Sequence, residues 1–271
     1  MEQEHKSTVI KTKTGEFAIA IDGPQEAPVL IFSNSLGTTL DMWQPQVDAL
    51  AKTHRVIRYD TRGHGGSVIT TGPYQFSDLG ADVLALMDAL AIEKAAFCGV
   101  SMGGHTGLWL AAHAAERFSH FVVCNTAAKI GTAEAWHDRA SLVRQGGQAA
   151  MEQLAQSSPQ RWFSSSFIES HPEVVAMAQS WVRSIDAEGY AACCEALAES
   201  DLRQDLAQIT TATLVVGGTE DPVTTMADAE FMQQHIRWAQ LEAIKASHLS
   251  NIEGAAAFNR ALLQFLTTKN T

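Results

Sequence analysis

Short apolar runs rich in β-branched residues alternate along this chain with longer segments whose apolar positions recur at helical spacing. Strands are predicted over residues 7–13, 16–22, 28–33, 55–60, 95–100, 121–125, 213–217 and 239–244. Helices are predicted over residues 43–52, 76–90, 103–115, 225–235 and 251–266. The first two strands form a hairpin around Thr14-Gly15. The later alternation predicts parallel βαβ units, and therefore an α/β fold with a mostly parallel twisted sheet flanked by helices.

Residues 130–205 break this alternation. They are rich in Ala, Glu, Gln and Trp, and they predict several helices with no convincing strand. Open α/β sheets bind ligands at the carboxyl ends of their strands, so a helical insertion after a central strand is expected to cover that edge. We therefore expect a core formed by residues 1–129 and 206–271, with a helical cap inserted over residues 130–205.

Composition narrows the possible partners. The chain has 271 residues, 46% of them hydrophobic, and a formal charge of −11 without a block rich in Lys or Arg. This charge argues against nucleic acid or an anionic membrane surface, but it leaves room for a small anionic substrate near a local arginine. No apolar run approaches the roughly 20 residues of a membrane span, and the polar start lacks a signal-peptide core. The four cysteines show no zinc spacing and suit reduced core thiols, so a cytoplasmic location is expected.

Residues 99–103 (Gly-Val-Ser-Met-Gly) place Ser101 between two glycines, where a predicted strand turns into a predicted helix. Such a turn exposes the serine hydroxyl, and the flanking glycines remove side chains that would clash there. The helix that follows presents free backbone N–H groups at its N-terminus. This pattern resembles the nucleophile elbow of the α/β-hydrolases and predicts acyl transfer. A chance Gly/Ser turn explains the five residues alone about as well, so the prediction depends on the rest of the chain.

A serine nucleophile needs a base to take its proton and an acid to orient that base. In α/β-hydrolases the acid and then the histidine follow the serine along the chain. Asp221 follows the predicted strand at 213–217, and His248 follows the predicted strand at 239–244. Ser101, Asp221 and His248 therefore lie at the carboxyl ends of three strands, on one edge of the sheet. Glu220 is the competing carboxylate, and a turn role for Asp221 before Pro222 is the structural alternative.

Attack on an ester carbonyl also needs donors for the developing oxyanion. The backbone N–H of Met102, directly after the nucleophile, is one candidate. In this superfamily the second comes from the loop after the strand at 28–33, which implies the N–H of Leu36. Asn34-Ser35 departs from the usual His-Gly of that loop, and Ser35 brings a hydroxyl toward the substrate. An ordinary strand-to-loop turn is the alternative.

Residues 60–67 match a second superfamily loop, in which we expect Asp60 and Arg62 to pair.

Six segments carry a closer likeness. They are 34–39 (Asn-Ser-Leu-Gly-Thr-Thr), 58–65 (Arg-Tyr-Asp-Thr-Arg-Gly-His-Gly), 101–104 (Ser-Met-Gly-Gly), 125–131 (Asn-Thr-Ala-Ala-Lys-Ile-Gly), 190–197 (Tyr-Ala-Ala-Cys-Cys-Glu-Ala-Leu) and 246–253 (Ala-Ser-His-Leu-Ser-Asn-Ile-Glu). With them the chain resembles the 3-oxoadipate enol-lactonases over residues 15–267. The resemblance implies hydrolysis of 3-oxoadipate enol-lactone to 3-oxoadipate, in the β-ketoadipate pathway of aromatic degradation, through an acyl-enzyme on Ser101.

A substrate of this kind carries a free carboxylate, which needs a cation or several donors in the pocket. The candidates in the predicted cap are Arg139, Arg144 and Arg161, with Lys129 at its entry. Trp136 and Trp162 are expected to form an apolar wall. For each of these residues, a solvated cap surface or simple cap packing is the alternative.

Other functions fit the same residues. A general carboxylesterase or a cofactor-free perhydrolase uses the same triad, whereas attack on carbon–halogen bonds calls for Asp at position 101. A non-catalytic ligand-binding protein of this fold is the alternative from another class, and the complete serine, acid and histidine set argues against it. The expected chemistry needs neither a metal nor an organic cofactor.

Overall fold

Eight strands form a single sheet in the computed structural model of this protein, which describes residues 7–267. The strands are β1 (Thr8–Lys11), β2 (Glu16–Asp22), β3 (Val29–Ser33), β4 (Arg55–Tyr59), β5 (Ala95–Val100), β6 (Phe118–Cys124), β7 (Ala212–Gly218) and β8 (Gln240–Ile244). Their order in the sheet is β1-β2-β4-β3-β5-β6-β7-β8. The hairpin β1–β2 joins β4 in antiparallel pairing, and all neighbours from β4 to β8 pair in parallel. The predicted mostly parallel α/β sheet is therefore confirmed.

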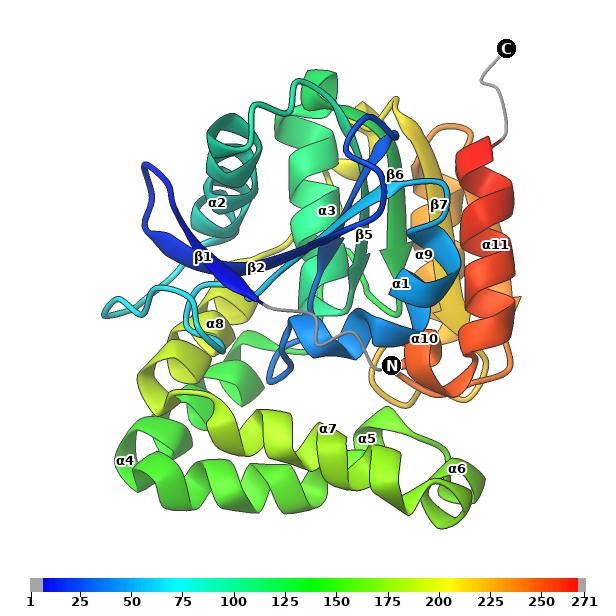
Figure 1. Ribbon diagram of the computed structural model, residues 1–271. Helices are drawn as coiled ribbons and strands as arrows, with labels where there is room; N and C mark the ends of the chain where they lie inside the picture. Colours follow the sequence, from blue (N-terminus) through cyan, green and yellow to red (C-terminus); the bar gives the residue numbers. More distant parts are fainter. Residues whose placement is uncertain (1–6, 268–271) are drawn as a thin grey trace, which may run out of the picture.

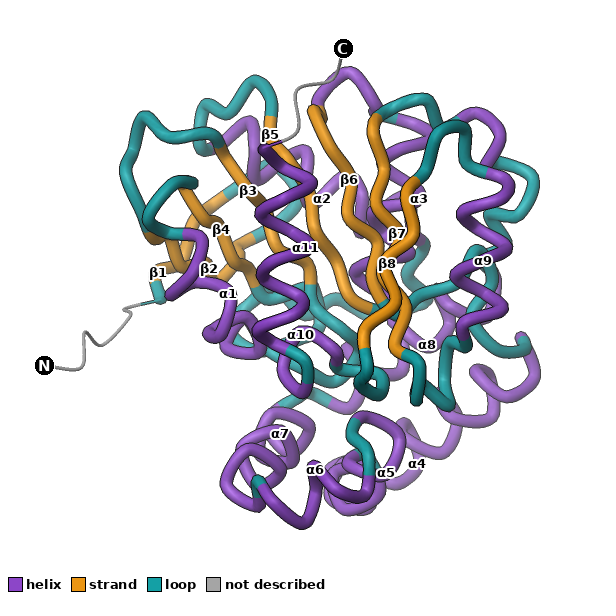
Figure 2. The backbone as a smooth tube through the Cα atoms, turned by 90° about the vertical axis from the view of Figure 1, so that its right-hand side faces the viewer, coloured by secondary structure: helices purple, strands orange, loops and turns teal. Residues whose placement is uncertain are grey.

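Helices cover both faces of this sheet (Figures 1 and 2). The α-helices are α1 (Gln44–Leu50), α2 (Phe76–Ala89), α3 (Met102–His113), α4 (Ala133–Ser157), α5 (Pro159–Trp162), α6 (Ser165–Ser170), α7 (Pro172–Ser184), α8 (Ala187–Glu199), α9 (Met226–His235), α10 (Ser250–Glu253) and α11 (Ala255–Thr267). Short 3-10 helices lie at Leu40–Trp43, Ala115–Arg117 and Leu206–Gln208. Residues predicted as one last helix divide at Gly254, where a side chain would meet Ile244 of β8.

Alternation along the central strands explains the two layers of helices. In β5, Phe97 packs in a core cluster with residues of α2, α3 and α9, whereas the next residue, Cys98, packs in a second cluster with residues of α1 and α11. Successive side chains of a strand point to opposite faces, and a parallel sheet buried on both faces is apolar throughout. Each strand of the centre therefore anchors helices on both of its sides.

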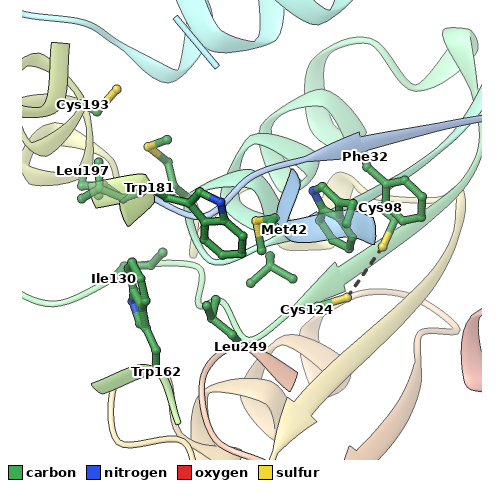
Figure 3. Close-up of a cluster of buried hydrophobic side chains, with 14 of the residues drawn as sticks. Phe32, Met42, Cys98, Cys124, Ile130, Trp162, Trp181, Cys193, Leu197 and Leu249 are labelled. Carbon is green, nitrogen blue, oxygen red and sulfur yellow. Dashed lines mark hydrogen bonds between the residues drawn. The ribbon is translucent and has the colours of Figure 1, made fainter. Parts of the chain in front are cut away.

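Helices α4 to α8 lie apart from these two layers. Figure 1 shows α4 to α7 beyond the sheet, at the ends toward which the arrows of β6 and β7 point. One buried apolar cluster continues from Phe32 and Cys98 in the sheet, through Leu249, to Trp162 and Leu197 in this helical segment (Figure 3). The helical segment is therefore packed onto the core through shared apolar contacts.

The loop at residues 60–67 differs from the prediction that Asp60 and Arg62 would pair. The Asp60 carboxylate accepts hydrogen bonds from the backbone N–H of Leu40, at 2.7 Å, and of Gly66, at 3.0 Å. Arg62 instead donates to both carboxylate oxygens of Asp82 in α2, at 2.5 and 2.6 Å. Asp60 thus ties neighbouring loops together, and its burial raises its pKa to about 6. The prediction was wrong because Asp82, twenty residues away in sequence, reaches Arg62 through the fold.

Loss of the Asp82 carboxylate is expected to destabilise the protein. Asp82→Ala leaves the largely buried Arg62 without its partner, and we expect a loss of about 3 kcal/mol in the free energy of unfolding. Urea denaturation provides the measurement. The exposed pair of Lys13 with Asp88 supplies a control, since Lys13→Ala should cost less than about 1 kcal/mol. Equal losses in the two variants would contradict a special role for the buried pair.

Candidate active site

Ser101 occupies the sharp turn between β5 and α3. Its backbone has φ 56° and ψ −116°, a conformation that side-chain-bearing residues seldom adopt. The turn also brings backbones into close contact. A Cβ at Gly99 would lie 2.2 Å from the carbonyl oxygen of Gly103, and one at Gly103 would lie 2.1 Å from that of Ser33. Both glycines of the sequence pattern are therefore required by space, as expected for a strand-turn-helix elbow.

Three residues predicted as a triad meet at this turn. The Ser101 hydroxyl lies 2.9 Å from His248 Nε2, and His248 Nδ1 lies 2.8 Å from Asp221 Oδ2. All three side chains are buried. Because the Asp221 carboxylate can only accept, Nδ1 carries the proton and Nε2 is left to accept from the serine. The competing carboxylate, Glu220, has an exposed side chain, and it is Asp221 that forms the hydrogen bond with His248.

Asp221 is held as an ionised acceptor by several donors. Asn125 Nδ2 and the Thr224 hydroxyl each lie 2.9 Å from Oδ2, and the backbone N–H of Val223 lies 2.7 Å from Oδ1. Burial favours a raised pKa, but the hydrogen bonds from His248 and Asn125 outweigh it and hold the pKa of Asp221 below its ordinary value. Sequence reasoning missed Asn125, although its place directly after β6 puts it at the same sheet edge.

A cavity of about 240 Å³ opens above Ser101 and His248. The sequence-predicted residues Ser35, Leu36, Trp136, Arg139, Arg161 and Trp162 line it. The lining also includes Ile130, Tyr190, Leu197, Pro222 and Val223. Of these, Tyr190 and Leu197 come from α8. The resemblance of residues 190–197 to the enol-lactonases did not identify them as pocket residues. The cavity thus has its reactive groups on the sheet side and its cations and indoles on the helical side.

The two arginines of the cavity have no acidic partner in the part of the chain that the structure describes. No carboxylate of residues 7–267 forms an ion pair with Arg139 or Arg161. Arg139 lies over the ring of Trp136, at 5.1 Å from its centroid, and Arg161 contacts the hydroxyl of Ser158 at 3.4 Å. Burial and the neighbouring Arg139 both lower the pKa of Arg161. Two uncompensated cations beside one cavity favour an anionic ligand.

Arg144 and Lys129 do not share this position. Arg144 in α4 forms ion pairs with Glu188, at 2.7 Å, and with Glu195, both in α8. It does not line the cavity, so the structure does not place it at the predicted substrate contact. Lys129 lies 3.5 Å from Asp201. Both cations already have carboxylate partners, which come from segments remote in sequence and therefore could not be assigned before the fold was known.

The two residues predicted as oxyanion donors, Met102 and Leu36, lie beside Ser101 and the cavity, respectively. Met102 is the first residue of α3, where N–H groups have no acceptor within the helix. Leu36 lies in the loop after β3 and lines the cavity. Gly37 in that loop, at φ +81°, donates its N–H to His64 Nε2 at 3.0 Å. Burial lowers the pKa of His64 to about 4, so its imidazole is a neutral acceptor near pH 7.

No group of His, Cys, Asp and Glu side chains between residues 7 and 267 is arranged to hold a metal ion. None of the helices in that range has the length and apolarity needed to cross a bilayer. All four cysteines are buried free thiols, with the sulfurs of Cys98 and Cys124 4.0 Å apart.

Comparisons with known proteins identify the family of this chain. The family model described as the alpha/beta hydrolase fold matches residues 28–255, and the chain belongs to that family. Its relatives include 3-oxoadipate enol-lactonases 2 and 1 of Acinetobacter baylyi. The first is 52% identical over 89% of this chain and 89% of the relative, and the second is 46% identical over 95% and 96%. The crystal structure of the enol-lactonase from Burkholderia xenovorans superposes with a TM-score of 0.93, at 44% identity over 96% of this chain and 100% of that one. Within the α/β-hydrolases, this chain is a member of the 3-oxoadipate enol-lactonase family.

The lowered pKa of Asp221 predicts how the free energy of unfolding depends on pH. Its folded-state pKa lies below the ordinary value of 3.8, so the ionised carboxylate stabilises the fold above that value. This stabilisation is lost as the pH falls through the folded-state pKa. Between about pH 6 and about pH 3, the wild type should therefore lose more unfolding free energy than Asp221→Asn. Chemical denaturation at each pH tests this, with Asp48→Asn as an exposed control that should follow the wild type.

Proposed function

We propose that this protein is a serine hydrolase that opens 3-oxoadipate enol-lactone to 3-oxoadipate through an acyl-enzyme on Ser101. The hydrogen-bonded triad of Ser101, His248 and Asp221 carries the proposal, because it lies at the wall of a cavity that two arginines also line. Neither arginine forms an ion pair with a carboxylate of the described residues. The names of the enol-lactonase relatives support the choice of lactone. The β-ketoadipate pathway is implied by those names.

In the proposed acylation, Ser101 Oγ attacks the lactone carbonyl while His248 Nε2 takes its proton. Asp221 stabilises the imidazolium that forms. The tetrahedral intermediate then breaks the ring C–O bond, and the ring oxygen leaves as an enol that receives the proton from His248. An enol is a better leaving group than a simple alkoxide, and it ketonises after release. Water activated by His248 then hydrolyses the acyl-enzyme and restores Ser101.

The negative charge on the carbonyl oxygen requires fixed donors. We assign this role to the backbone N–H groups of Met102 and Leu36. The position of Met102 at the start of α3 adds the positive end of the helix dipole. For Leu36, the hydrogen bond from Gly37 to the neutral His64 supports the loop that carries the donor.

The free carboxylate of the substrate is proposed to bind Arg139 and Arg161. Neither guanidinium has an acidic partner to displace among the described residues, and both arginines line the cavity from helices of the segment 130–205. Trp136 and Trp162 supply the apolar wall along the ring, and Ser35 contributes a hydroxyl beside the proposed oxyanion donors. We retain the helical segment 130–205 as the cap of the site, as the sequence predicts.

Replacement of the nucleophile tests the mechanism. Ser101→Ala should reduce the rate of lactone opening at least about a thousandfold, since catalysis that remains would come from binding and the oxyanion donors alone. A spectrophotometric assay with the purified enol-lactone measures it, with Ser180→Ala on the exposed side of α7 as the control. If Ser101→Ala kept most of the rate, the proposed mechanism through an acyl-enzyme would be contradicted. A wild type that a fluorophosphonate probe fails to label would favour a binding protein.

Replacement of the cavity arginines tests the substrate class. Arg161→Ala should lower kcat/KM for the enol-lactone about 10- to 100-fold, the usual range for a hydrogen bond to a charged group, but for a neutral short-chain ester by less than about threefold. Arg139→Ala should behave alike. Arg183→Ala is the matched control, because this α7 arginine pairs with Glu152 and does not line the cavity. An equal loss on both substrates would reject the carboxylate contact and favour a general carboxylesterase.

A further inference from the structure

The loop that carries His248 is tied down on both sides of the histidine. Before it, the backbone N–H of Ser247 donates to Glu253 Oε2 at 3.0 Å. After it, the backbone N–H of Leu249 donates to the carbonyl oxygen of Trp162 at 3.0 Å. Both acceptors lie outside the loop, so the position of the imidazole depends on what holds Glu253 and Trp162.

Glu253 reaches the helical segment with the same carboxylate. The side chain comes from the end of α10, and its Oε2 also accepts from the backbone N–H of Ser164 at 3.2 Å. Its other oxygen, Oε1, accepts from the Ser164 hydroxyl. Ser164 is the N-cap residue of α6. One carboxylate therefore joins the start of α6 to the residue that precedes His248, through three donors.

Trp162 forms the second link between the same two segments. It ends α5, directly after Arg161, and its indole lines the cavity while its carbonyl holds Leu249. Trp162 and Leu249 also belong to one buried apolar cluster (Figure 3). Residues 162–164 are therefore linked to the histidine loop at two backbone N–H groups. The N–H of Leu249 is bound directly, and the N–H of Ser247 is bound through Glu253.

We propose that Glu253 is a positioning residue for His248, acting by tying the histidine loop to the helical segment at Ser164. The inference rests on the proposed role of His248 as the base. Glu253 does not line the cavity, so it has no direct contact with the reacting atoms. Without its carboxylate, the N–H of Ser247 and both donors of Ser164 lose this acceptor. The loop then loses one of its ties next to His248, and the imidazole is expected to shift relative to Ser101. A displacement of about 1 Å in such a group lowers rates by on the order of a hundredfold.

The role predicts a loss in kcat rather than in KM. Glu253→Ala should lower kcat, and the rate constant for labelling of Ser101 by a fluorophosphonate, by about 30- to 100-fold, while KM changes by less than about threefold. Glu253→Gln keeps an acceptor at one oxygen only, so it should lose several-fold and provides a folded variant if Glu253→Ala does not fold. Glu152→Ala, which removes the partner of Arg183 within the helical segment, is the control and should change neither rate.

Variants at Ser164 test whether the link to the helical segment matters. Ser164→Ala should lower kcat several-fold, and Ser164→Thr should restore it because the hydroxyl is kept. In Glu253→Ala, the further change Ser164→Ala should cost nothing more, since the two groups act through one contact.

Three outcomes are distinguishable. The kcat-specific losses with rescue by threonine support the positioning role. A labelled wild type together with Glu253 variants that are labelled at the same rate, or that change only the melting temperature, overturns that role alone. A folded wild type without labelling at Ser101 overturns the proposed function itself.

Discussion

The backbone of Ser101 is the constraint around which the site is built. A residue with a side chain at φ 56° is strained by on the order of 1–3 kcal/mol, so its surroundings must hold it there. The N–H of Ser101 donates to the carbonyl of Cys124 at 2.9 Å, and its own carbonyl accepts from Thr126 and His105. These bonds come from β6, the residues after it and α3. The sheet and the following helix therefore stabilise the turn that exposes the hydroxyl.

Parallel pairing then brings the remaining groups to this turn. Strands β5, β6, β7 and β8 lie side by side in one direction, so the residues that follow them meet at one edge of the sheet. Ser101, Asn125, Asp221 and the loop of His248 each follow one of these strands. Asn125 connects two of them, since its amide donates both to Asp221 and to the carbonyl of Ser247. The geometry of the series thus follows from strand order.

The helical segment supplies what the sheet lacks. The protein carries a net charge of −11, yet the cavity is lined by two arginines that pair with no carboxylate between residues 7 and 267. By contrast, Arg144 pairs with Glu188 and Glu195 of α8, and Arg183 pairs with Glu152 of α4. The turn that carries Arg161 also carries Trp162, whose carbonyl holds the histidine loop. The proposed carboxylate contact and the hydrogen bond that holds the histidine loop therefore come from the adjacent residues Arg161 and Trp162.

The periodicity of apolar residues by itself determined the strands, the helices and the parallel sheet, because all three depend on local spacing and on burial. It also determined that residues 101, 221 and 248 would share an edge, since residues that follow parallel strands must do so. The partners of charged side chains were decided only by the tertiary structure. Arg62 pairs with Asp82 rather than with Asp60. Arg144 forms ion pairs with Glu188 and Glu195. These pairs depend on distances between segments far apart in sequence. The same holds for Tyr190 in the cavity and for Glu253 behind His248, whose neighbours are set by how the helices pack onto the sheet.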